Sequence, residues 1–199
     1  MPDPMPVRVP ASPVSGPDRK ARRTLLLIAA IALAPLVASY TIYYFFPRAA
    51  FVNYGTLLPT APAPDLRGEG PDAKPFALSA LRGRWVLVVA GDGACDAACR
   101  RKLYATRQAR TMQGRDQERI VRVWLVTDAT APAADVLADH PGLVVARVPA
   151  SAAAQLPGGP GPIYLVDPLG NLVLRYPEDP DIKGIGKDLG RVLKASGIG

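Results

Sequence analysis

A long segment without charge is the feature of this chain that most limits how it can fold. Residues 24–46 read TLLLIAAIALAPLVASYTIYYFF and contain no Asp, Glu, Lys, Arg or His. At a rise of about 1.5 Å per residue, roughly 20 apolar residues of helix cross a hydrocarbon core of about 30 Å. Pro35 lies in the middle of the segment, a position that helices in lipid tolerate. The sequence therefore predicts one transmembrane helix over residues 24–46, in contact with membrane lipid.

The charges beside this segment predict its orientation. Four cations precede it in the run RKARR at residues 19–23, whereas Arg48 alone follows it closely. Tyrosine and phenylalanine gather at its distal end, as in an interfacial aromatic belt. Because cytoplasmic flanks carry the excess of Lys and Arg, we expect residues 1–23 to form a basic cytoplasmic tail. Residues 47–199 then lie in the periplasm, and the chain is a single-pass protein of the cell inner membrane.

A cleavable signal peptide is the alternative interpretation of the same segment. Val37, Ala38 and Ser39 would form a cleavage site of small residues. The apolar run continues for seven residues past Ser39, to Phe46, and a mature N-terminus would expose it to water. This continuation favours a retained anchor.

Composition excludes two classes of function. The net charge is +7, from 24 Lys and Arg against 17 Asp and Glu, and five of the cations lie within the first 23 residues. The remaining surplus is spread out, whereas a nucleic-acid interface concentrates it in a stripe, so no nucleic-acid partner is expected. Two cysteines and one histidine are too few for a four-ligand zinc site of Cys and His alone.

Beyond the apolar segment, the chain divides into a linker and a domain. Residues 47–74 are rich in proline and glycine without periodicity, which predicts a stalk. From residue 75 onward, strands, helices and a hairpin alternate: strands at 85–90, 120–126 and 143–148, helices at 95–113, 133–139 and 181–196, and a hairpin of 163–166 with 172–176. Residues 149–162 are expected to form a loop. This order predicts a three-layer α/β sandwich over residues 75–199.

The two cysteines are the residues best placed for chemistry. Cys95 and Cys99 follow the first strand of this domain and stand at the start of its first helix. A spacing of four residues brings their sulfurs close enough to bridge with modest backbone adjustment. The positive end of the helix dipole favours thiolate at Cys95, which we expect to be the more exposed and more acidic thiol. A purely structural disulfide is the alternative, but a bridge that closes so short a loop adds little to the stability of the fold.

The flanking motifs resemble the Sco/SenC family of membrane-anchored, thioredoxin-like copper proteins. The resemblance is carried by residues 76–88 (FALSALRGRWVLV) followed by C-x3-C, and by residues 162–173 (PIYLVDPLGNLV), and it extends over roughly 75–196. It implies a thioredoxin-like fold, copper held by Cys95 and Cys99, and work in cytochrome c oxidase assembly with an oxidase subunit or another thiol or copper protein. It also places Pro162 where thioredoxin-like proteins carry a proline that faces the cysteines.

The third copper ligand of Sco proteins, a histidine shortly before the hairpin, is missing from residues 156–162 (LPGGPGP). His140 ends the second helix, so we expect it at the opposite end of the sheet from the cysteines. Two functions remain open from the sequence. One is a thiol–disulfide or Cu(I)-linked role, which would make the protein a thiol–disulfide oxidoreductase, and the other is a non-catalytic interaction module with a structural disulfide. In the first, Cys95 attacks a partner disulfide and Cys99 resolves the mixed disulfide.

Overall fold

A computed structural model describes residues 19–45 and 53–197 of the chain. The predicted cytoplasmic tail up to residue 18 and residues 46–52 of the predicted helix end and stalk lie outside the described residues. The chain divides into two compact units, residues 1–50 and 51–199, and each is described by itself.

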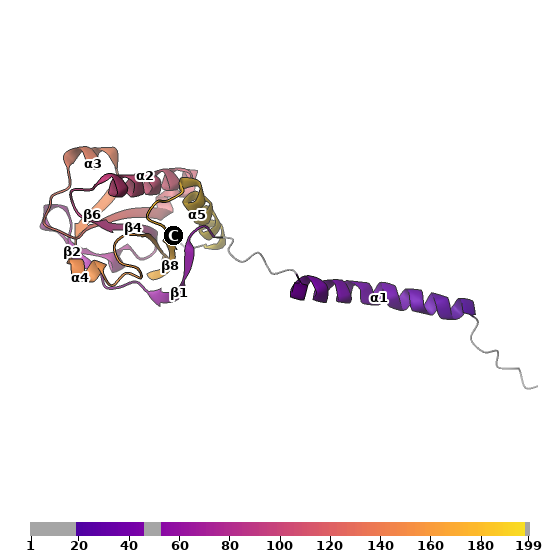
Figure 1. The fold of residues 1–199 in the computed structure, drawn as a ribbon. Helices are drawn as coiled ribbons and strands as arrows, with labels where there is room; N and C mark the ends of the chain where they lie inside the picture. The colour runs from indigo at the N-terminus through magenta and orange to yellow at the C-terminus, as the bar shows by residue number, and fades with distance from the viewer. Residues whose placement is uncertain (1–18, 46–52, 198–199) are drawn as a thin grey trace, which may run out of the picture. The chain divides into compact units, whose positions relative to one another are not determined.

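The described part of the first unit is one helix, α1 (Arg19–Phe45; Figure 1), whose 27 residues correspond to a length of about 40 Å. None of its residues is buried, and its most apolar 18-residue window has a mean hydropathy of 2.3. The helix also includes residues 19–23, which were predicted to belong to the tail. Lysine and arginine are good helix formers, so the helix extends back through them. By length and composition, α1 is able to cross a membrane.

The second unit is built on one mixed sheet of eight strands. Their order is β1-β8-β7-β4-β5-β6-β2-β3, with β4, β5 and β6 parallel and the remaining neighbours antiparallel. The strands are β1 (Thr56–Pro62), β2 (Arg67–Glu69), β3 (Pro75–Ala77), β4 (Trp85–Gly91), β5 (Ile120–Val126), β6 (Leu143–Arg147), β7 (Ile163–Val166) and β8 (Asn171–Tyr176). The predicted central strands and the hairpin are therefore present. The apolar runs of β4, β5 and β7 are buried on both faces, as in the centre of a sheet, whereas β8 buries alternate residues.

Helices cover both faces of this sheet and complete the predicted three-layer α/β sandwich. One core contains Cys99 and Leu103 of α2 (Ala97–Thr111), Val136 of α3 (Ala134–Asp139) and Leu189 of α5 (Ile182–Ala195). The opposite core contains Ala153 of α4 (Ala150–Ala153), a short helix within the predicted loop. Three 3-10 helices complete the elements: η1 (Pro71–Ala73), η2 (Leu78–Leu81) and η3 (Gly114–Arg119).

The prediction of a stalk over residues 47–74 is wrong where this range forms the strands β1 and β2. β1 pairs with β8, and β2 lies between β6 and β3, so both belong to the sheet. Leu66, between them, is 1% exposed and packs in the core that also contains Ala153. Pro59 and Pro62 misled the prediction, because an edge strand accepts prolines that an interior strand rejects.

Glycines in α5 lower its helix propensity but allow close packing. A Cβ atom on Gly184 would lie 2.4 Å from Cγ of Tyr54, and one on Gly186 would lie 2.9 Å from Sδ of Met112. Larger residues would separate α5 from these side chains. The glycines therefore lower the helix propensity of α5 but let its backbone pack closely against the two side chains.

Candidate functional site

The loop between β4 and α2 carries the cysteines at the carboxyl end of a central strand. The backbone N–H of Gly93 donates to Oδ1 of Asp128 at 2.8 Å, and that of Cys95 donates to the carbonyl of Asp92 at 3.1 Å. A Cβ atom at Gly93 would lie 1.9 Å from the carbonyl oxygen of Thr130. Glycine at this position therefore allows the loop to pass close to the segment after β5. Reactive groups commonly collect at this end of an α/β sheet.

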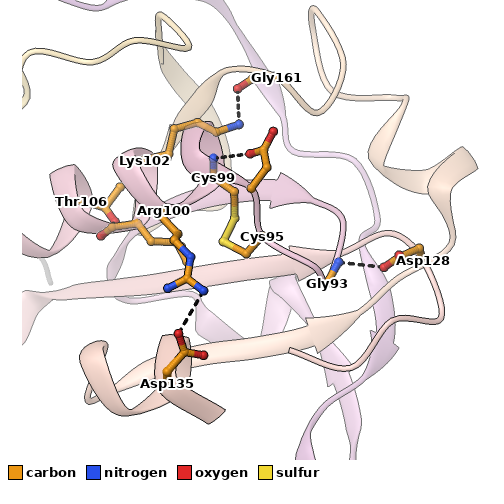
Figure 2. Close-up of a disulfide and its surroundings, with 11 residues drawn as sticks. Gly93, Cys95, Cys99, Arg100, Lys102, Thr106, Asp128, Asp135 and Gly161 are labelled. Carbon is orange, nitrogen blue, oxygen red and sulfur yellow. Dashed lines mark hydrogen bonds and ion pairs between the residues drawn. A yellow bond between two sulfur atoms is a disulfide. The ribbon is translucent and has the colours of Figure 1, made fainter. Parts of the chain in front are cut away.

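Cys95 and Cys99 form a disulfide, with their Cα atoms 5.0 Å apart (Figure 2). The expected proximity of the two sulfurs is confirmed. The expectation that Cys95 is the more exposed of the two is wrong for this oxidised state, because Cys95 is 3% and Cys99 is 6% exposed. Both residues pack into the core beneath α2, which hides them almost equally.

The helix terminus differs from the sequence expectation at one point. Asp96 is the N-cap of α2, and its Oδ1 accepts a hydrogen bond from the backbone N–H of Cys99 at 2.8 Å. Cys95 stands just before this cap with a φ of 45°, outside the helix. The carboxylate of Asp96 thus occupies part of the positive helix end that was expected to stabilise a Cys95 thiolate.

A cavity of about 340 Å³ opens beside the disulfide. It is lined by both cysteines, by the β4–α2 loop, and by two segments distant in sequence that contribute Gly161 and Glu178. Lys102 of α2 also lines it, is 7% exposed, and donates from Nζ to the carbonyl oxygen of Gly161 at 2.8 Å. Burial lowers the pKa of Lys102, whereas the charges of Glu178 and Asp96 act in the opposite direction.

The three consecutive cations of α2 have different surroundings, and the sequence alone did not indicate which of them lies at the disulfide. Arg100 pairs with Asp135 of α3 at 3.0 Å, and Arg101 lies 3.6 Å from Asp179. Both arginine side chains are about half exposed, with 46% and 59% of their surface in solvent. Lys102 alone of the three lines the cavity. Its position three residues after Cys99 was the one signal in the sequence that it belongs to the site.

Pro162 directly precedes β7, and its peptide bond is trans, as no cis bond occurs among the described residues. The residues of this segment that line the cavity are Pro160 and Gly161. The segment is held by Tyr164, whose hydroxyl oxygen lies 3.0 Å from the carbonyl oxygen of Pro157 and 2.6 Å from that of Gly159. Tyr164 therefore fixes the loop that meets Lys102.

His140 caps the C-terminus of α3, at a distance from the disulfide. Arg122 donates from Nη2 to the carbonyl of Pro141 at 2.6 Å and pairs in register with Leu87 of β4. The carboxyl end of β4, where the cysteine loop begins, pairs with Val126, four residues or about 13 Å further along β5. His140 thus lies toward the other end of the sheet, as its sequence position predicted. Burial and the charge of Arg122 lower its pKa.

The residues beside the disulfide do not fit the copper site that the Sco resemblance implies. Soft thiolate and imidazole donors suit Cu(I), yet the lining of this cavity adds no histidine to the two sulfurs. The polar side chains that it does add include the Asp96 and Glu178 carboxylates, which are hard donors, and the Lys102 ammonium, which repels a cation. No group of three or more His, Cys, Asp or Glu suited to a metal occurs in the described ranges.

A disulfide between a central strand and the first turn of a helix, in a sheet of this order, is the arrangement of a thioredoxin-like domain. The chain belongs to the family described as transmembrane-like, thioredoxin-like, C-terminal domain, whose model matches residues 85–196. No curated protein sequence matches the chain.

Solved structures with the same fold confirm the resemblance to Sco proteins. Apo Sco1 of Thermus thermophilus is 26% identical, with a TM-score of 0.53 over 74% of this chain and 99% of that one. Copper-bound yeast Sco1 is 18% identical, with a TM-score of 0.58 over 70% of this chain and 96% of that one. The thioredoxin domain of a Bacteroides vulgatus thiol-disulfide oxidoreductase is 16% identical, with a TM-score of 0.52 over 68% and 99%.

Proposed function

We propose that this protein carries out thiol–disulfide exchange through Cys95 and Cys99. The observation that carries the proposal is the disulfide itself, which closes five residues at the carboxyl end of β4 and borders a cavity. A bridge across so few residues removes little entropy from the unfolded chain and so contributes little stability. Its position beside a cavity supports a chemical role.

In the proposed reaction, the Cys95 thiolate attacks one sulfur of a partner disulfide. That disulfide breaks, and its other sulfur leaves as a thiolate that takes up a proton. Cys99 then gives up its proton and attacks Sγ of Cys95, which forms the Cys95–Cys99 disulfide and releases the second partner thiolate for protonation. The partner gains two electrons and two protons, and a dithiol protein must later return both to the pair.

The partner that we propose is a disulfide-bearing subunit or assembly protein of a respiratory oxidase. Sco-like structures with the same fold support this choice, as does a helix able to anchor the domain at a membrane. The charge asymmetry around that helix supports a cytoplasmic N-terminus and a periplasmic domain in the cell inner membrane. A reporter that is active only outside the cytoplasm, fused after residue 199, should give signal and remain in the membrane fraction.

Trapping tests the reaction and the partner together. Cys99→Ser should accumulate a mixed disulfide between Cys95 and the partner, because the resolving thiol is absent. Cys95→Ser is the matched control and should trap none. Mass spectrometry of the trapped species then identifies the partner, and equal trapping by both variants would contradict the assigned order of attack.

The competing function is an interaction module with a permanent disulfide, which the burial of both cysteines favours. The reduction potential separates the two. A structural bridge has a potential below about −300 mV, whereas a working pair is expected above it. Equilibration of the full chain in detergent with dithiol buffers, followed by alkylation, measures this potential. Titration of the reduced chain with Cu(I) tests the copper role implied by the Sco resemblance, for which we expect weak binding without a histidine.

A further inference from the structure

Lys102 is a buried cation whose direct partner is uncharged. Lysine is seldom buried without a paired charge, yet Lys102 is 7% exposed and its ammonium donates to the Gly161 carbonyl. Among the described residues, no carboxylate forms a contact ion pair with it; Glu178 and Asp96 act on it only through space. Its charge is thus only partly compensated while the disulfide is closed.

The position of Lys102 relative to Cys99 suggests which negative charge would balance the charge of the ammonium. The two residues are three apart on α2, which places them on one face of the helix. Both line the same cavity, and Figure 2 shows the Lys102 side chain passing the backbone of Cys99 and ending at the Gly161 carbonyl. The other charged residues that line this cavity are Asp92, Asp96 and Glu178, and all three disfavour an additional negative charge. Lys102 is the one cation in the lining.

We propose that Lys102 is a positioning residue that stabilises the Cys99 thiolate when the disulfide is open. This inference rests on the proposed function. Reduction by an external dithiol transfers two electrons and two protons to the pair and oxidises that dithiol to a disulfide. Once Cys95 has formed the mixed disulfide with the partner, Cys99 loses its proton to solvent, and its thiolate carries a negative charge into the cavity that Lys102 also lines. A larger thiolate fraction at Cys99 then speeds the second, resolving step.

A purely structural role for Lys102, that of tying the 157–161 loop to α2, makes different predictions. Lys102→Gln keeps a hydrogen-bond donor and removes the charge, whereas Lys102→Arg keeps both. Arg101→Gln is the matched control, since it removes the adjacent charge of the same helix from an exposed position. If the charge matters, only Lys102→Gln changes the chemistry of Cys99. If the tie alone matters, Lys102→Gln leaves that chemistry unchanged.

Alkylation of the full chain in detergent provides the first test. In a Cys95→Ser background, Cys99 is the only thiol, and its rate with iodoacetamide is followed below the ordinary thiol pKa of about 8.5. We expect Lys102→Gln to slow alkylation about tenfold, with Lys102→Arg and Arg101→Gln within about twofold of the parent. A rate for Lys102→Gln within twofold of the parent, or equal slowing by Arg101→Gln, overturns the proposal.

A second test uses the unsubstituted chain and so does not depend on whether a variant folds. If the thiolate stabilises the ammonium, reduction must raise the pKa of Lys102, because the coupling acts equally on both groups. NMR titration of ¹³C-labelled lysine in the oxidised and reduced chains measures this, and an unchanged Lys102 pKa overturns the proposal. Failure of thiol–disulfide exchange itself is seen separately, as a wild-type disulfide that dithiol buffers reduce only at structural potentials.

Discussion

The carboxylate of Asp188, on α5, accepts a hydrogen bond from the backbone N–H of Gly55 at 2.9 Å, immediately before β1 begins. It also accepts from the N–H of Tyr54 and pairs with Arg191, each at 3.1 Å. Asp188 is fully buried, so these bonds replace the water that a carboxylate needs. One side chain thereby fixes where the chain enters the edge of the sheet.

Asp188→Asn should lower the free energy of unfolding by about 2–3 kcal/mol. The amide fits the same space, but one of its two ends is a donor that faces another donor, and Arg191 loses its charged partner. Urea denaturation measures the change. Asp179→Asn, at an exposed carboxylate near Arg101, is the control and should change stability little. Equal effects of the two substitutions would show that Asp188 does not hold β1.

Two substitutions at Asp96 should separate its cap from its charge. Asparagine caps helices as well as aspartate does, so Asp96→Asn should leave stability nearly unchanged, while Asp96→Ala should cost about 1 kcal/mol. Both remove a negative charge beside the cysteines and should speed thiol alkylation, because a nearby carboxylate disfavours a thiolate. Slower alkylation in both variants would contradict this electrostatic effect.

Tyr164→Phe should loosen the loop over the disulfide and lower stability by about 1–2 kcal/mol, since the Pro157 and Gly159 carbonyls lose a donor. Tyr104→Phe, at an exposed tyrosine of α2, is the control. Burial raises the pKa of Tyr164 to about 12, so its phenol stays protonated where an ordinary tyrosine titrates, near pH 10. Its contribution is complete below about pH 10 and declines as the pH rises toward 12. The wild type minus Tyr164→Phe difference in phenolate absorbance should show a transition well above pH 10.

We expect mild acid to destabilise the folded domain through His140. Burial lowers its pKa below the ordinary value of 6.5, so the unfolded chain takes up a proton at a pH where the folded chain does not. Stability is therefore expected to fall as the pH drops below about 6.5, and His140→Gln should remove this part of the decline. Because the chain has one histidine, its imidazole NMR signals need no further assignment. Thiol alkylation should be the same in both proteins; a change would place His140 closer to the disulfide than the strand register does.

The parts of the fold that could be predicted are those whose burial is visible in residue type. Trp85–Ala90 is apolar throughout and Ile120–Val126 is apolar except for Arg122, and it is a central strand of a covered sheet that buries nearly every residue in this way. β1 escaped prediction because an edge strand has neither that run nor strict alternation, and its prolines imitate a linker. Its place in the sheet depends on Asp188, more than a hundred residues further along the chain.

The candidate site divides in the same way. The spacing of Cys95 and Cys99 determines their proximity locally, so it could be foreseen. The burial of Lys102 is set by Gly161 and Glu178, which tertiary folding alone brings to α2. A lysine on a polar helix is ordinarily exposed to solvent, so the residue type alone predicts an exposed Lys102 and not a buried one.

The two edge strands determine how readily the sheet can pair with a strand of another molecule. β1 at one end has prolines at positions 59 and 62 and an irregular register with β8 between Leu57 and Ala61; β3 at the other end has three residues and begins with Pro75. Proline offers no N–H to an incoming strand, and so short or irregular an edge provides few bonds in register. We therefore expect neighbouring copies crowded on one surface to resist edge-to-edge aggregation.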